Sequence, residues 1–74
     1  MNKIERYQTY QKIAEILMDK EVNYDCLCNI VQKATGLMTP IIIERHIKNM
    51  LLFGFIKTSD SSPLLWTAAG EMIQ

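Results

Sequence analysis

The chain has 74 residues, the size of one small domain. Its hydrophobic fraction of 49% and charged fraction of 22% exclude a disordered or a collagen-like protein. Eight basic and eight acidic side chains give a formal net charge of zero, which excludes a protein whose whole surface attracts nucleic acid. No apolar run approaches the roughly 20 residues of a membrane-spanning helix, and an acid among the first six residues predicts no signal peptide. We therefore expect one cytoplasmic domain over residues 1–74.

The charges are distributed unevenly along the sequence. Residues 32–59 carry four bases and one acid, a net charge of +3, and the rest of the chain carries −3. One face of the folded domain can therefore be basic enough to meet phosphate groups. An asymmetry of three charges can also arise by chance.

Residues 4–20 predict a first amphipathic helix. Asn2 is its expected N-cap, and Glu5 stands three residues later, as in a capping box. Apolar residues at helical spacing predict the buried side, which comprises Tyr7, Tyr10, Ala14 and Leu17, with Ile13 and Met18 beside them. Ile4 and Ile16 fall outside this stripe, so we predict that they contact a second copy of the chain in a homodimer. The alternative is that a short last helix covers Ile16 within one chain.

A second helix is predicted after a short polar link. Asn23 is its expected N-cap, and Gly36 supplies the left-handed conformation that ends it. Its expected buried stripe comprises Leu27, Ile30, Val31 and Ala34. Cys26 and Cys28 lie two positions apart on this helix and point about 200° apart, so both are expected to stay reduced. Only His46 is available to join them, and a zinc site is therefore not expected.

The third helix is predicted from residue 40 to residue 53. Thr39 is its expected N-cap, Pro40 occupies the first helical position, and Gly54 ends it. One side carries Ile43, Ile47, Met50 and Leu51, and the other carries Ile41, Ile42, Arg45, Lys48, Asn49 and Leu52. The few residues between the second and third helices match the spacing of a helix-turn-helix.

The remaining sequence predicts a β-hairpin and a short helix. Residues 55–58 and 64–66 are rich in strand-forming types, and the polar residues 59–63 separate them. Thr67 is the expected cap of a last helix over residues 68–73.

This order of elements resembles the winged helix-turn-helix family, a mostly α fold with a β-hairpin as its wing. The resemblance covers most of the chain. The residues that carry it are Ala34-Thr35-Gly36-Leu37 at the turn, Ile43, Ile47 and Met50 in the third helix, Gly54-Phe55-Ile56 after that helix, and Trp66-Thr67-Ala68-Ala69-Gly70 after the wing. The sequence looks most like small archaeal and archaeal-virus regulators of this family. The resemblance implies a transcription regulator that places residues 39–53 in the major groove of double-stranded DNA, with hairpin 55–66 as the wing.

The resemblance also implies which residues meet DNA. Arg45 would pair with guanine and Asn49 with adenine, Ile42 would contact a thymine methyl group, and Lys48 and Lys57 would contact phosphates. The full predicted set is Thr39, Ile42, Arg45, His46, Lys48, Asn49, Lys57, Ser59, Ser61 and Ser62.

Other interpretations stay open for several of these residues. Arg45 and Lys48 can be ordinary solvated charges, and His46 can be a neutral histidine packed at the edge of the core. The wing tip carries Asp60 and no base, which predicts weak insertion into a minor groove. The apolar residues Ile41, Ile42 and Leu52 support an alternative function, a winged-helix protein-interaction module without DNA binding.

An enzyme is not expected, because the chain has a single histidine and none of the sequence motifs of catalytic or phosphate-binding sites. The sequence likewise predicts no cofactor, no small-molecule substrate and no membrane partner.

Overall fold

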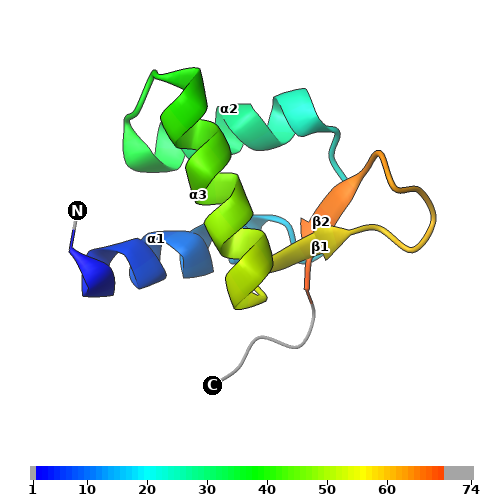
Figure 1. Ribbon diagram of the computed structural model, residues 1–74. Helices are drawn as coiled ribbons and strands as arrows, with labels where there is room; N and C mark the ends of the chain where they lie inside the picture. Colours follow the sequence, from blue (N-terminus) through cyan, green and yellow to red (C-terminus); the bar gives the residue numbers. More distant parts are fainter. Residues whose placement is uncertain (1, 70–74) are drawn as a thin grey trace.

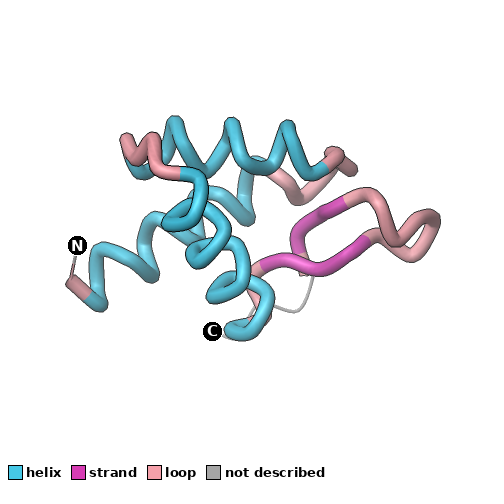
Figure 2. Tube along the Cα trace, turned by 45° about the horizontal axis from the view of Figure 1, so that its top comes forward, coloured by secondary structure: helices cyan, strands magenta, loops and turns pink. Residues whose placement is uncertain are grey.

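The computed structural model describes residues 2–69. Three helices, α1 (Lys3–Ile16), α2 (Tyr24–Thr35) and α3 (Pro40–Phe53), precede an antiparallel hairpin of β1 (Ile56–Thr58) and β2 (Trp66–Ala68). α2 contacts both other helices, β1 follows α3, and β2 lies against α1 (Figure 1). The hairpin stands to one side of the three helices (Figure 2). The predicted class, mostly α with a β-hairpin, is confirmed.

The N-termini of α1 and α2 are capped by asparagine side chains, as predicted. Oδ1 of Asn2 accepts the backbone N–H of Glu5 at 2.8 Å, and Nδ2 of Asn2 donates to the Glu5 carboxylate at 3.0 Å. Oδ1 of Asn23 accepts the backbone N–H of Cys26 at 2.8 Å. Each cap satisfies a backbone donor that has no partner within its helix.

The turn between α2 and α3 also follows the prediction. Gly36 ends α2 at φ +74° and Gly54 ends α3 at φ +84°, a region that strongly favours glycine. α3 begins at Pro40, directly after Thr39, whose side chain makes no capping hydrogen bond. The axes of α2 and α3 differ by 97° across this turn.

α1 ends four residues earlier than predicted, at Ile16 instead of residue 20. The carbonyl of Leu17 accepts hydrogen bonds from the Thr67 hydroxyl at 3.1 Å and from the Ala68 backbone N–H at 3.3 Å. These contacts attach β2 to the C-terminal end of α1.

The second strand lies two residues further along the chain than predicted. β2 pairs with β1 in the register Ile56–Ala68, Lys57–Thr67 and Thr58–Trp66. Trp66 also exchanges both backbone hydrogen bonds with Val22, at 2.7 and 2.9 Å, so β2 lies between β1 and the segment that precedes α2. This bridge was not predicted.

Thr67 and Ala68 belong to β2, so the prediction that Thr67 caps a final helix starting at residue 68 is wrong. Residues 70–73 of that predicted helix lie outside the described residues.

One apolar core joins the helices to the sheet. It comprises Tyr10, Ile13, Ala14, Leu17, Leu27, Val31, Ile43, Ile47, Met50, Ile56 and Ala68. Four residues predicted to face the core are exposed instead: Ala34, Tyr7 by 41%, Met18 by 61% and Leu51 by 46%. Met18 lies beyond the last turn of α1, so the helical periodicity that placed it in the stripe no longer applies.

No single helix within residues 2–69 has the length and apolar character needed to cross a membrane. α2 and α3 meet these two criteria only when taken together, and they form a sharply bent pair.

Candidate nucleic-acid interface

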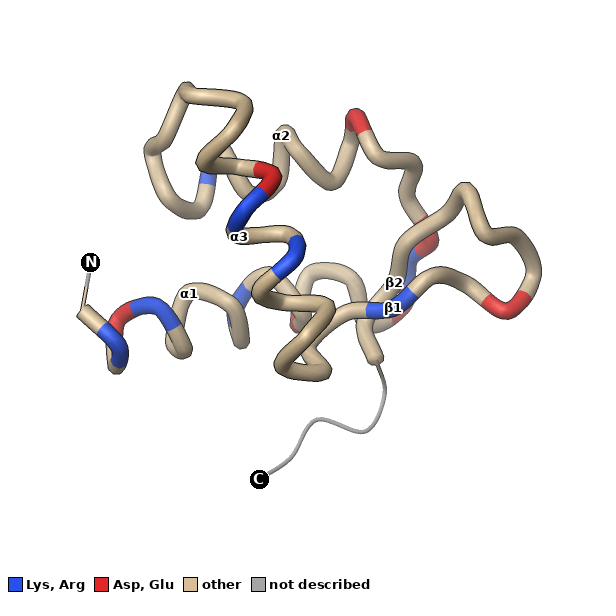
Figure 3. The backbone as a smooth tube through the Cα atoms, viewed as in Figure 1, with Lys and Arg blue, Asp and Glu red and all other residues tan. Residues whose placement is uncertain are grey.

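The side of α3 that faces away from the core carries Ile41, Arg45, Lys48 and Leu52, which we call the outer stripe. Their spacing of four, three and four residues places them on one face of the helix. All four are exposed, Ile41 by 64% and Leu52 by 79%. Figure 3 shows the two basic positions in the middle of α3. The outer stripe therefore presents two cations between two apolar ends.

A neighbouring side of α3 carries His46 and Asn49 and faces α1. Nδ1 of His46 lies 2.6 Å from the Tyr10 hydroxyl, and Nδ2 of Asn49 donates to the same hydroxyl at 3.4 Å. Both side chains are half-buried. These two predicted base contacts are thus directed at α1, and the interpretation of His46 as a packed histidine matches its position.

Arg6, which is not among the predicted site residues, contributes positive charge near His46. Burial lowers the pKa of His46 below its ordinary value of 6.5, and the guanidinium groups of Arg6 and Arg45 lower it further. Arg6 is half-buried one turn before Tyr10, and its Nε has no hydrogen-bond partner among the described residues. The spacing of four residues from Tyr10 was the available sign that Arg6 faces α3.

Thr39 and Ile42 lie at the start of α3. Thr39 is exposed, and Ile42 is half-buried on the side that also carries His46. Of the predicted residues in this first turn, Thr39 is therefore the more accessible.

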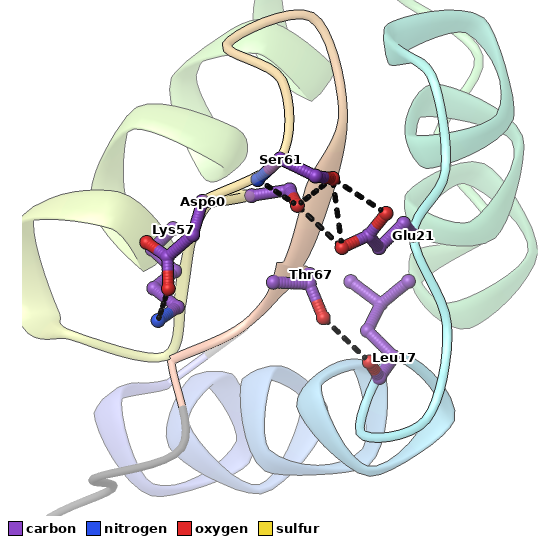
Figure 4. A network of polar contacts seen from close by, with 7 residues as sticks. Leu17, Glu21, Lys57, Asp60, Ser61 and Thr67 are labelled. Carbon is purple, nitrogen blue, oxygen red and sulfur yellow. Dashed lines mark hydrogen bonds and ion pairs between the residues drawn. The ribbon is translucent and has the colours of Figure 1, made fainter.

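The serine hydroxyls of the hairpin loop are turned inward, toward Glu21. Ser59 is buried, and its hydroxyl donates to the Glu21 carboxylate and lies 2.9 Å from the Ser61 hydroxyl. The Ser61 hydroxyl donates to Glu21 at 3.1 Å (Figure 4). The hydroxyl of Ser62 accepts the backbone N–H of Leu64 at 3.2 Å. The predicted phosphate contacts of these three hydroxyls are replaced by contacts within the chain.

Lys57 points out from β1 but is paired with an acid. Its Nζ lies 3.8 Å from the carboxylate of Asp60, which is 97% exposed. The pair lowers the basic character of the hairpin, so the accessible positive charge of the predicted set is concentrated on α3.

The two residues predicted to form a dimer contact lie on different parts of α1. Ile4 is 70% and Ile16 is 45% exposed. Twelve residues separate them by roughly 18 Å along the helix and by about 120° around it. Ile4 lies one turn from Tyr7, whose ring meets that of Phe53 edge-on at 5.7 Å. We call these three residues the Ile4 cluster, and all three are exposed.

A shallow hollow of about 580 Å³ lies between α2 and α3. Cys28 contributes to its wall, and burial raises the pKa of this thiol, which keeps it protonated at neutral pH. Cys26 and Cys28 are both free. Within residues 2–69 no three metal-ligating side chains come together.

No protein-family model matches the chain, and neither a curated protein nor a solved structure matches it. A functional assignment therefore depends on the residues and their arrangement.

Proposed function

We propose that the protein is a winged-helix transcription regulator that binds double-stranded DNA in the cytoplasm. Residues 39–53 would lie in the major groove, and hairpin 55–66 would be the wing. Two features of the fold support this proposal. α2 and α3 meet at 97° across a short glycine-containing turn, within the 90–120° typical of helix-turn-helix pairs. β2 pairs on both sides, which attaches the hairpin firmly to the helices.

The outer stripe of α3 is the observation that carries the proposal. Arg45 and Lys48 are exposed on it, and none of its four residues is acidic. A helix of 14 residues with cations at its centre matches the dimensions and the charge of a DNA major groove. Arg45 suits a guanine edge, and Lys48 suits a phosphate.

The hairpin has a smaller role in this proposal than the resemblance implies. Asp60 is exposed at its tip, and the serine hydroxyls of its loop are held by one another, by Glu21 or by the loop backbone. Negative charge at the tip opposes entry into a minor groove. We therefore assign affinity mainly to α3.

We also propose that the protein binds DNA as a homodimer. A single domain with no net charge offers few phosphate contacts, and a twofold pair presents two recognition helices to half-sites roughly 34 Å apart. The Ile4 cluster is the surface that we assign to this contact.

Binding of a random duplex pool across a range of salt concentrations tests the function. Counterion release predicts measurable binding at low salt and a steep loss of affinity as salt rises. A charge-reversal variant, Arg45→Glu with Lys48→Glu, should abolish binding, and Lys12→Glu on α1 is the matched control. Absence of duplex binding at low salt would instead favour the protein-interaction module, for which Ile41 and Leu52 offer the contact.

A further inference from the structure

We propose that α3 recognises the methyl group of thymine through Ile41, beside a guanine that Arg45 contacts. This inference rests on the proposed DNA-binding function and specifies the kind of duplex that the protein selects. It follows from which side chains the fold leaves free to meet base edges.

Hydrogen-bonding readers are scarce on the accessible side of α3. Asn49 and His46 are the predicted side chains that could contact adenine or guanine through a neutral polar group. Both are half-buried and hydrogen-bonded to Tyr10. Arg45 and Lys48 are the outer-stripe residues with hydrogen-bond donors. An apolar contact adds selectivity beyond guanine, and thymine is the base that offers a methyl group in the major groove.

Ile41 is better placed for this contact than Ile42. Ile41 is 64% exposed on the outer stripe, whereas Ile42 is half-buried on the side that faces α1. Ile41 also lies in the first turn of α3, and the N-terminal part of a recognition helix is the part that reaches base edges.

The spacing of Ile41 and Arg45 defines the expected sequence. One helical turn separates them, about 6 Å along the axis, which corresponds to one or two base-pair steps of roughly 3.4 Å. The preferred site is therefore expected to hold a thymine within two base pairs of the guanine read by Arg45.

The opposite end of the outer stripe provides an internal control. Leu52 is 79% exposed and lies eleven residues from Ile41, roughly 16 Å along α3. The N-terminal part of a recognition helix is the part that reaches base edges. Leu52, near the C-terminal end of α3, is therefore too far from Ile41 to contact the same base pair.

The experiment begins with repeated selection of bound duplexes from a random pool, to obtain a preferred sequence. Each thymine of that sequence is then replaced by deoxyuridine, which removes the methyl group and leaves base pairing unchanged. We expect at least one position at which deoxyuridine weakens binding about threefold to fivefold, the value of one buried methyl group. Ile41→Ala should abolish the difference between thymine and deoxyuridine at that position, and Leu52→Ala should preserve it.

The outcomes separate this inference from the function on which it rests. Tight, salt-dependent binding that is equal for thymine and deoxyuridine at every position would overturn the inference and leave the DNA-binding function intact. A deoxyuridine effect that Ile41→Ala leaves unchanged would also overturn it. Failure to bind any duplex at low salt would overturn both and would favour a protein partner for the outer stripe. Circular dichroism of Ile41→Ala should match the unsubstituted protein, because the side chain is exposed.

Discussion

The hydroxyl of Tyr10 lies 2.6 Å from Nδ1 of His46 and joins α1 to α3. Tyr10 is fully buried, and Asn49 donates to the same hydroxyl. When Nδ1 of His46 is unprotonated, it accepts the proton of the Tyr10 hydroxyl, while the oxygen of that hydroxyl accepts from Asn49. Burial and the neighbouring arginines favour the neutral form of His46 at this contact between α1 and α3.

We predict that stability falls as the pH is lowered below 6.5. The folded-state pKa of His46 is below its ordinary value of 6.5, because burial and the nearby Arg6 and Arg45 disfavour the charged ring. The unfolded chain therefore takes up a proton first, and the stabilisation present above pH 6.5 is lost as the pH falls toward the lowered pKa. Urea denaturation at a series of pH values between 7.5 and 5 measures this slope.

The matched control for this prediction is His46→Gln, which cannot titrate in this range. His46 is the single histidine of the chain, so the variant should lose most of the pH dependence between 7.5 and 5.5. Equal slopes for both proteins would show that His46 is not held neutral by the fold.

Arg45 and Lys48 should have separable effects on DNA binding. Arg45→Ala is expected to cost about 1–3 kcal/mol on a preferred site and little on unrelated duplexes, because a base contact is lost. Lys48→Ala is expected to weaken all duplexes alike and to reduce the salt slope by about 1. Fluorescence anisotropy with preferred and scrambled duplexes distinguishes the two. Unchanged affinity of both variants at low salt would show that α3 does not lie in the major groove.

Glu21 should stabilise the hairpin loop. In Glu21→Ala the buried Ser59 hydroxyl loses its carboxylate partner, and we expect a loss of about 1–2 kcal/mol in the free energy of unfolding. Asp60→Ala, which removes an exposed carboxylate from the same loop, is the control and should leave stability unchanged. Chemical denaturation of the two variants provides the comparison, and equal stabilities would mean that the Glu21 contact contributes nothing.

The Ile4 cluster should mediate dimer formation. We expect the wild type to sediment at twice the 8.6 kDa chain mass at high micromolar concentration. Ile4→Glu should yield folded monomers, because burying one such side chain contributes roughly 1.5–3 kcal/mol. Ile16→Glu should leave the dimer intact, since Ile16 lies about 120° around α1 from Ile4. Dissociation by Ile16→Glu alone would assign the interface to the other end of α1.

Features of the fold that depend on local sequence were predictable. The caps at Asn2 and Asn23 and the helix ends at Gly36 and Gly54 each follow from a few neighbouring residues. The apolar periodicity of α3 likewise placed Ile43, Ile47 and Met50 in the core, but it also placed Leu51 there, which is exposed.

Features that depend on contacts between distant segments were not predictable. Thr67 contacts the end of α1, and β2 pairs with Val22 as well as with β1. The inward direction of Ser59 depends on Glu21, which is 38 residues away in the sequence. No local pattern contains this information, so the contacts of these hydroxyls with Glu21 were not predicted.

The anchoring of β2 to both Val22 and Leu17 has a consequence for how the domain folds. Thr67 and Leu17 are 50 residues apart, so their contact closes a long loop of chain and carries a large entropic cost. Local contacts within the helices form faster than such distant ones. We therefore expect the turn between α2 and α3 to form before the contacts that attach the hairpin to α1.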